Sequence, residues 1–376
     1  MISLVVSLIF AVYVSLVVVL IVGWRLASRK KEMIDLQNQP LVSIIIPARN
    51  EENTITLLLS DISAQSYQHF ELIVVDDHSQ DATIERVEKE VTHDSRFIVL
   101  KSNGIGKKQA LTTAIRSAKG SIIITTDADC RVNKNWVNSI LPYFSDNETR
   151  MVFGGVKISC HSFFDDVQAL EFASLIGSGA ATSALGFPTM CNGANLAFRK
   201  DVFEEVDGYS GNMDVPSGDD EFLMRKIKAK YPKGIVFAGS SETVVSTAPS
   251  LDLKAFMHQR IRWAGKWKHN QSMASMMLAF FILLFQASTI ALPILMLSNQ
   301  IDSQMGSVLF MAKILVEYIF LQQVSSFLLL HWSWKAFILL QGLYPFYVVT
   351  IGLLSNFLSF SWKGRTLKSL TVKDKD

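Results

Sequence analysis

The chain has 376 residues, of which 49% are hydrophobic, and its mean hydropathy of +0.27 is high for a soluble protein. The net charge of +2 identifies no class of partner, and we expect no nucleic acid among the partners. The three cysteines are odd in number and lack the spacing of a metal site, so a reduced cytoplasmic domain with free thiols is the simplest interpretation.

The first apolar segment covers residues 3–22, contains no charge and is long enough to span a bilayer. A signal peptide is the alternative, but no basic residue precedes the segment and no small-residue cleavage site follows it. By the positive-inside rule, the basic residues that follow are expected to stay in the cytoplasm. We therefore expect a transmembrane helix over residues 1–24 and a polar linker over residues 25–40.

Residues 41–250 alternate between apolar runs typical of strands buried on both faces and segments with helical spacing. This alternation predicts an α/β domain with a Rossmann-type, mostly parallel sheet flanked by helices. The first expected elements are strands at 41–47, 70–77, 96–101 and 121–129 and helices at 53–65, 81–94 and 106–120.

Clusters that contain polar residues stand at the ends of three of these strands. They are "PARNEE", which starts at Pro47, "DDHSQD", which starts at Asp76, and "DADC", which starts at Asp127. Because ligands of open α/β sheets bind beyond the carboxyl ends of the strands, these clusters together indicate a site. In extended chain, Asp127 and Asp129 would point to the same side and form a fork of oxygens suited to a divalent cation that also holds phosphate. Taken alone, the pair could equally be a solvated turn.

A basic, amphipathic segment with tryptophan covers residues 251–273 and is typical of a helix at a membrane interface. Residues 274–360 follow and contain three long apolar stretches, which we expect to be transmembrane segments. Lys313 and Glu317 interrupt the second stretch, but they lie four residues apart and can pair away from lipid.

Three crossings after a cytoplasmic domain would leave the basic tail, residues 361–376, outside the cell, against the positive-inside rule. One segment is therefore a candidate for a re-entrant or interfacial position, with Pro345 as a possible break. We expect a multi-pass protein of the cell membrane with a cytoplasmic catalytic domain, and the number of crossings stays open.

Five stretches in one order carry a family resemblance: "PARNEE" at 47–52, "VVDDHSQD" at 74–81, "DAD" at 127–129, "GDDEF" at 218–222 and "QRIRW" at 259–263. Over roughly residues 41–270 the chain resembles a family 2 glycosyltransferase, a family that includes cellulose and hyaluronan synthases and ceramide glucosyltransferases. The resemblance implies a GT-A-like domain and a metal-dependent hexosyltransferase that uses a UDP-sugar.

On the donor side, the resemblance implies a nucleoside site formed by Pro47, Arg49, Glu51 and Asp77. It assigns Asp127 to the ribose and metal-bound water, and Asp129 to Mg²⁺ or Mn²⁺ bridging two phosphates. Such a cation would remove the repulsion between the carboxylates and stabilise the departing diphosphate. Asp76 and His78 are better explained as parts of a strand-end turn.

Further donor contacts are expected from Lys108 and Asn195. Lys107 and Lys108 open the third helix and could place a fixed positive charge near the phosphates, although lysines at a helix start are usually just solvated. Asn195, in "MCNGANLAFRK", is expected to reach the donor sugar or diphosphate. Gly193 in the same loop would allow close backbone approach on the acceptor side, or it could mark an ordinary turn.

Sugar transfer requires a base that takes the proton of the acceptor hydroxyl. The resemblance places this carboxylate at Asp220, at the start of a helix, where the helix N-terminus favours the ionised form. Asp219 is expected to be mainly structural, as acids at helix starts often are. A single base without a nucleophile partner favours direct displacement, and hence inversion at the anomeric carbon.

The "QRIRW" stretch matches the Q-x-x-R-W pattern of the family. The match implies that Gln259 and Trp263 contact the acceptor and that Arg262 compensates diphosphate charge by bidentate hydrogen bonds.

We expect transfer to a lipid or glycan acceptor by single or short addition, because the C-terminal segments are too few for a roomy polymer channel. A processive polysaccharide synthase is the alternative, since such enzymes share the Q-x-x-R-W pattern. A non-catalytic nucleotide-sugar-binding membrane subunit would be favoured by loss of an acid at position 127, 129 or 220, but all three acids are present. A transporter would leave the soluble half unexplained.

Overall fold

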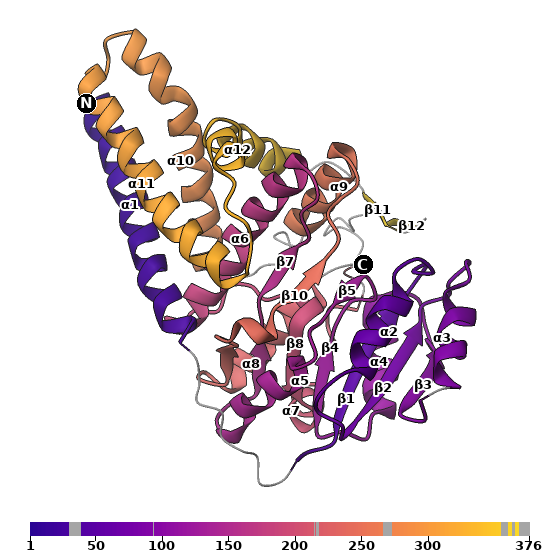
Figure 1. The fold of residues 1–376 in the computed structure, drawn as a ribbon. Helices are drawn as coiled ribbons and strands as arrows, with labels where there is room; N and C mark the ends of the chain where they lie inside the picture. The colour runs from indigo at the N-terminus through magenta and orange to yellow at the C-terminus, as the bar shows by residue number, and fades with distance from the viewer. Residues whose placement is uncertain are drawn as a thin grey trace, which may run out of the picture.

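The computed structural model describes residues 1–29, 39–92, 94–213, 215, 218–265, 273–354, 360–362 and 365–367. An α/β unit lies at one end of the molecule and a group of long helices at the other (Figure 1). Parts of the expected linker, of the interface segment and of the basic tail fall outside the described residues. The domain limits given above stay predictions.

The α/β unit is built on a seven-stranded sheet with the order β3-β2-β1-β4-β8-β6-β9. β1 pairs in parallel with β2 and β4, and β2 with β3. β8 runs antiparallel to β4 and β6, and β6 pairs in parallel with β9. The predicted α/β architecture is thus confirmed. The strands are β1 (Val42–Ala48), β2 (Phe70–Asp76), β3 (Phe97–Lys101), β4 (Ile122–Thr125), β6 (Met151–Phe153), β8 (Leu196–Arg199) and β9 (Ile235–Phe237).

The central strands are mostly apolar because helices cover both faces of the sheet. Ile44 and Ile46 of β1 belong to a hydrophobic cluster with α2 (Ile55–Ser63) and α3 (Thr83–Val91). Ile45, between them, belongs to a second cluster with α4 (Lys107–Ser117). Successive side chains of a strand point to opposite faces, so both faces are buried, and the polar side chains of Ser43 and Glu71 hydrogen-bond to each other.

The strand order reverses between β1 and β4, where α2 and α3 cover one face of the sheet and α4 the other. Ligands of such sheets bind at this switch point, beyond the carboxyl ends of the strands. The fold therefore brings the residues that follow β1 next to those that follow β4.

Smaller elements complete the α/β unit. A second sheet has the order β5-β10-β7, and α8 starts directly after Gly218, whose φ of 79° lies in the left-handed region that favours glycine. These elements are β5 (Cys130–Arg131), β7 (Val156–Ile158), β10 (Val245–Thr247), α5 (Trp136–Ile140), α7 (Lys200–Glu205) and α8 (Asp219–Lys230), with a separate hairpin of β11 (Phe360–Trp362) and β12 (Arg365–Leu367).

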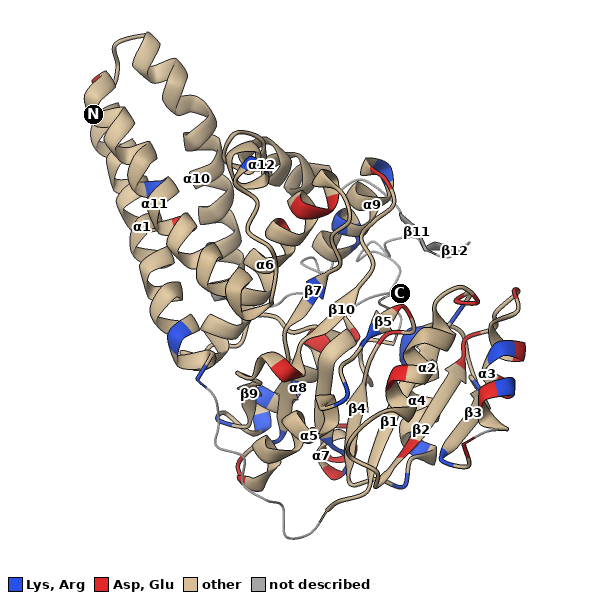
Figure 2. Ribbon diagram, in the orientation of Figure 1, with Lys and Arg blue, Asp and Glu red and all other residues tan. Residues whose placement is uncertain are grey.

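Four helices are long and apolar enough to cross a membrane: α1 (Ile2–Ala27), α10 (Met273–Leu297), α11 (Ser303–Phe327) and α12 (Trp334–Leu354). Charged residues are sparse on them and frequent on the α/β unit (Figure 2). This composition indicates a multi-pass membrane protein. The helix α12 continues through Pro345, so the break considered at this proline is absent from the structure.

The predicted pairing within the membrane helices is confirmed. Lys313 Nζ lies 2.9 Å from Glu317 Oε2, and Gln341 Nε2 donates to the same oxygen at 3.0 Å. Tyr13 of α1 donates to the other carboxylate oxygen at 2.7 Å. The charge of Glu317 is therefore compensated between helices rather than exposed to lipid.

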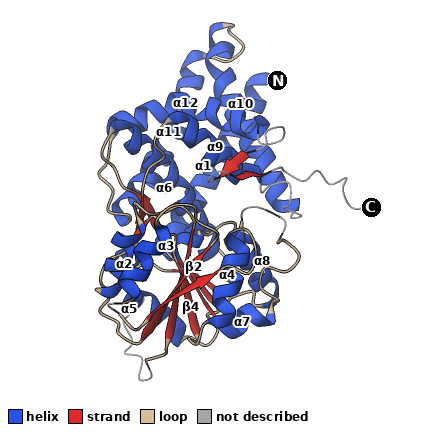
Figure 3. Cartoon of the chain, turned by 90° about the vertical axis from the view of Figure 1, so that its right-hand side faces the viewer, coloured by secondary structure: helices blue, strands red, loops and turns tan. Residues whose placement is uncertain are grey.

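Two helices connect the α/β unit to the long apolar helices. The helix α6 (Phe163–Ala184) was not predicted, and it packs against α1, α11 and α12 on one side and β7 on the other. It lies between the sheets and the membrane helices in both Figure 1 and Figure 3. The helix α9 (Leu253–Ala264), which carries the "QRIRW" stretch, packs against α12.

Candidate active site

One cavity of about 1180 Å³ reaches from the carboxyl ends of the strands into the long apolar helices. All five motif stretches contribute to its lining, so residues far apart in sequence meet at one place. Asp129 and Asp220 both line it. The residues named from the sequence that line the cavity are Pro47, Arg49, Glu51, Asp77, Asp127, Asp129, Gly193, Asp220, Gln259, Arg262 and Trp263.

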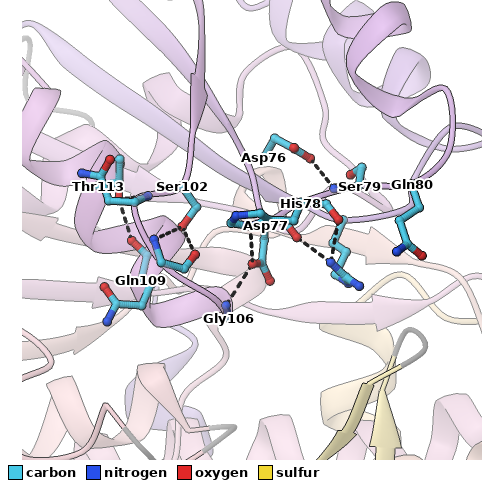
Figure 4. Close-up of polar contacts among 12 residues, drawn as sticks. Asp76, Asp77, His78, Ser79, Gln80, Ser102, Gly106, Gln109 and Thr113 are labelled. Carbon is cyan, nitrogen blue, oxygen red and sulfur yellow. Dashed lines mark hydrogen bonds and ion pairs between the residues drawn. The ribbon is translucent and has the colours of Figure 1, made fainter.

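Hydrogen bonds hold the segment that follows β2, part of which lines the cavity, to its neighbours (Figure 4). The buried guanidinium of Arg49 donates to the carbonyl oxygens of Asp77 and His78, each at 2.7 Å. The backbone N–H of Gly106, at the start of α4, donates to Asp77 Oδ1 at 2.9 Å. Asp76 accepts from the backbone N–H of Ser79 at 3.0 Å, which confirms its place in a strand-end turn.

Asp127 and Asp129 do not form the expected fork on extended chain. The strand β4 ends at Thr125, and the backbone N–H of Cys130 donates to the carbonyl of Asp127 at 3.0 Å, which closes a turn. The carboxylate of Asp127 accepts a hydrogen bond from the ammonium of Lys107, whereas Asp129 Oδ2 accepts from the hydroxyl of Thr247 at 3.4 Å. The two carboxylates thus have different partners while lining one cavity.

The fixed positive charge comes from Lys107. Its Nζ lies 2.6 Å from Asp127 Oδ1 and 3.6 Å from Asp219 Oδ2. Burial by itself would lower the pKa of Lys107, but these neighbouring carboxylates outweigh it and raise the pKa above its ordinary value. The ammonium therefore stays charged and offsets the repulsion among the aspartates.

The assignment of Lys108 to the donor site is wrong in this structure. Its side chain is buried and does not line the cavity. The ammonium donates to the carbonyl oxygens of Asn212 and Val215, at 2.7 and 2.9 Å. Lys108 therefore holds the loop before α8 in place.

The loop at Gly193 packs tightly against the start of α8. The backbone N–H of Gly193 donates to Asp220 Oδ2 at 3.0 Å, and the carbonyl of Gly193 accepts from the hydroxyl of Thr125 at 2.9 Å. A Cβ at position 193 would lie 3.1 Å from Asp219 Oδ2. A side chain here would require the Asp219 carboxylate to shift by a few tenths of an ångström.

Asn195 also departs from expectation, because its side chain is turned away from the cavity. Its Oδ1 accepts from the indole N–H of Trp136 at 3.1 Å. Its Nδ2 donates to the carbonyl oxygens of Gly155 and Thr243, at 2.9 and 2.7 Å. With 1% of the residue exposed, Asn195 joins three segments of the core and is not available to a donor sugar.

The helix α9 brings a second positive charge to the carboxylates. Burial lowers the pKa of Arg262, and the negative charges of Asp127 and of the two aspartates at the start of α8 oppose this shift. Trp263 lines the cavity, with its ring centroid 5.6 Å from that of Phe172 in α6.

Arg260, the second residue of the "QRIRW" stretch, was missed by the sequence analysis. Its Nε lies 3.2 and 3.1 Å from the two carboxylate oxygens of Glu171 in α6. Tyr347 of α12 donates to the same carboxylate at 3.0 Å. The pair joins residues 89 positions apart, so no local pattern in the sequence indicates it.

The carboxylates of the cavity fit one type of metal site. Among the described residues, no three or more histidine, cysteine, aspartate or glutamate side chains are placed to hold a metal ion together. Mg²⁺ and Mn²⁺ at phosphate sites need only one or two carboxylates, because substrate phosphates and water complete the coordination. Asp127 and Asp129 fit that pattern, and a cage made of protein ligands alone does not.

Part of the chain matches a known family of proteins. Residues 43–207 match the family described as Glycosyl transferase family 2. A glycosyltransferase of Haloferax volcanii, AglE, is 27% identical over 195 residues, which are 51% of this chain and 63% of that protein. The poly-beta-1,6-N-acetyl-D-glucosamine synthase of Staphylococcus aureus is 27% identical over 248 residues, 64% of this chain and 58% of that protein. The chain thus spans about 60% of the length of these curated relatives.

A solved structure shares the fold over most of its length. It is a mannosyltransferase from Pyrobaculum calidifontis in complex with GDP-Man and Mn²⁺, with a TM-score of 0.55 and 17% sequence identity. The likeness covers 94% of this chain and 98% of that one. It confirms the GT-A-like fold class.

Proposed function

Because residues 43–207 match glycosyl transferase family 2, we propose that this chain is a membrane-bound, inverting transferase that moves a sugar from a UDP-sugar to a lipid or glycan acceptor by single or short addition. The observation that carries this proposal is one cavity lined by Asp129, Asp220 and Arg262, which come from three separate segments. The four apolar helices support attachment to a membrane, with the α/β unit on the cytoplasmic side.

The donor would lie along the carboxyl ends of the strands. Arg49 and Asp77 form a polar wall that is held by hydrogen bonds, which suits a nucleoside. Asp127 would contact the ribose. Lys107 and Arg262 supply positive charge for the diphosphate. The residues proposed to contact the nucleoside are Pro47, Arg49, Glu51 and Asp77.

A divalent cation, Mg²⁺ or Mn²⁺, held by Asp129 with Asp127 nearby, would supply charge stabilisation for the departing diphosphate. Asp127 already has a cationic partner in Lys107 at 2.6 Å. We therefore propose Asp129 as the main protein ligand because the resemblance assigns the cation to it, with Asp127 beside it.

The proposed chemistry uses Asp220 as the base. Its carboxylate takes the proton of the acceptor hydroxyl while the acceptor oxygen bonds to the anomeric carbon. The bond from that carbon to the diphosphate oxygen breaks at the same time, and its electron pair leaves with the nucleotide. The N–H of Gly193 orients the carboxylate, and a helix N-terminus favours the ionised form that a base requires. Attack opposite the leaving group inverts the anomeric carbon.

The acceptor would be held by α9. Gln259 and Trp263 line the cavity beside Arg262, where α9 packs against α6 and α12. An acceptor between them would have its hydroxyl near Asp220.

A screen of nucleotide sugars tests this proposal. Membranes carrying the wild type or Asp220→Asn are given UDP-sugars and GDP-sugars, and nucleotide release is measured with and without Mn²⁺ or Mg²⁺. We expect metal-dependent release by the wild type and little by the variant. Equal release by both would remove Asp220 from the chemistry. Retention of the anomeric configuration, by NMR of the product, would contradict direct displacement.

A processive polysaccharide synthase is the second candidate, because one curated relative is a poly-beta-1,6-N-acetyl-D-glucosamine synthase. Product length distinguishes the two. Short products at all donor concentrations support single or short addition, and long polymers at early times support processive synthesis.

A further inference from the structure

The cavity continues beyond the candidate active site into the long apolar helices. At its far end it is lined by α1, α6, α10, α11 and α12. Most of the side chains there are aliphatic or aromatic, including Leu16, Leu20, Leu283, Phe320, Val348 and Ile351. This part of the cavity favours an apolar occupant.

The polar side chains of this region mostly satisfy one another. The carboxylate of Glu317 accepts from Tyr13, Lys313 and Gln341. A glycan threaded through the helices would need free hydrogen-bonding groups along its length, because buried hydroxyls without partners are costly. The occupied hydrogen bonds therefore argue against a sugar chain here.

The cavity also reaches the outer surface of the membrane helices. Three of its lining residues, Val19, Met276 and Phe280, are 49%, 46% and 68% exposed. They lie on α1 and α10, whose length and composition suit a membrane span. A bilayer would cover this surface, so this part of the cavity would face lipid rather than water.

We propose that the acceptor is a membrane lipid that enters from the bilayer between α1 and α10. Its hydrocarbon chain occupies the apolar part of the cavity, and its hydroxyl or phosphate reaches Asp220 and Arg262 at the polar end. This inference rests on the proposed function and names the class of its acceptor. The cavity is continuous from the carboxylates to the apolar helices, which matches a molecule that is polar at one end and apolar along its length.

Two alanines of α10 provide a matched pair of variants. Ala279 lines the cavity, whereas Ala287 is exposed and does not line it. Ala279→Trp should fill the space proposed for the lipid chain, and Ala287→Trp adds the same bulk on the outside of the same helix.

The full chain is placed in phosphatidylcholine vesicles that contain a polyisoprenyl phosphate or a diacylglycerol, with a soluble N-acetylglucosamine oligosaccharide as competing acceptor. Nucleotide sugars labelled in the sugar are added, and the products are partitioned between organic and aqueous phases. We expect label in the organic phase, reduced at least tenfold by Ala279→Trp and changed less than twofold by Ala287→Trp. Nucleotide binding, measured by thermal stabilisation, should be the same in all three proteins.

Label transferred only to the water-soluble acceptor would overturn the lipid assignment and leave the proposed transferase function standing. Equal lipid labelling by the two tryptophan variants would overturn the proposed location of the lipid's hydrocarbon chain. Absence of nucleotide binding and donor turnover in the wild type would instead contradict the proposed function itself.

A further variant distinguishes a hydrocarbon chain from a hydrogen-bonding occupant of the apolar part of the cavity. Gln286 is buried, lines the cavity, and its Oε1 has no hydrogen-bond partner in the described part of the chain. Gln286→Leu should keep or raise lipid labelling if a hydrocarbon chain lies beside it. A tenfold loss would indicate a hydrogen-bonding occupant and contradict the inference.

Discussion

Arg260 and Glu171 form an ion pair that is closed off from solvent, with 3% and 4% of their side chains exposed. The guanidinium also lies 4.4 Å from the centroid of the Trp263 ring. The pair fixes α9, which carries Arg262 and Trp263, to α6 and through Tyr347 to α12. The position of the proposed acceptor-binding residues therefore depends on the membrane helices.

We expect Arg260→Met to destabilise the protein strongly, because it leaves the carboxylate of Glu171 buried without its cation. Breaking one side of such a pair costs about 3–5 kcal/mol. Thermal unfolding in detergent measures this loss, and Arg260→Met combined with Glu171→Gln should recover part of it. Lys89→Met, which breaks the exposed pair with Glu85, serves as the control. If Arg260→Met had the same thermal unfolding midpoint as Lys89→Met, the buried pair would not stabilise the fold.

Adjacent lysines should give different phenotypes. Lys107→Met removes the positive charge beside Asp127 and Asp219, so we expect kcat to fall by about 10²-fold, as for loss of a single preorganised group in other enzymes. Lys108→Met should lower the thermal midpoint while the active protein keeps its kcat, because its ammonium binds loop carbonyls. Steady-state kinetics and thermal unfolding of both variants check this, and the reverse pattern would refute the assignment.

Asp220→Asn should lower kcat by about 10² to 10⁴, the range expected for loss of a general base. Nucleotide binding should persist, because the amide keeps the size of the carboxylate and can still accept from the N–H of Gly193. Asp219→Asn should affect stability more than kcat. Kinetics together with nucleotide titration distinguish the two, and a larger kcat loss in Asp219→Asn would move the base to that residue.

Asn195→Ala should destabilise the fold because the buried indole N–H of Trp136 and the carbonyl of Thr243 lose their partner, while the carbonyl of Gly155 keeps the N–H of Val245. Each unsatisfied buried group costs about 1–3 kcal/mol. KM for the donor should change little in protein that remains folded, because Asn195 does not line the cavity. A stable variant with a strongly raised donor KM would restore the donor contact expected from the sequence.

The parts of the fold that could be predicted from the sequence are those marked by apolar runs or motifs within short stretches of the chain. The runs around Ile45 and Ile73 are mostly apolar because both faces of their strands are covered, and each is followed by polar residues at the edge where ligands bind. Asp127, Asp129 and Asp220 were found through motifs whose order and spacing are visible in the chain, and they line one cavity.

The parts that were missed depend on orientation or on distant partners. Successive residues of a helix point about 100° apart, so Lys107 and Lys108 face different surroundings although the sequence treats them alike. Asn195 lies in a recognisable loop, but its direction is set by Trp136 and by two distant carbonyls. The helix α6 is apolar enough to resemble a core segment. Glu171 of this helix pairs with Arg260, which is far away in sequence.

The structure of the full chain with uridine diphosphate and Mn²⁺ is the most direct test of the central claim that carboxylates from separate loops form one donor site. We predict the diphosphate between Asp129 and Arg262, Mn²⁺ on the Asp129 carboxylate, and Asp220 facing the position of the transferred sugar. A nucleotide bound outside this cavity, or a Mn²⁺ ion that contacts neither Asp127 nor Asp129, would contradict the claim.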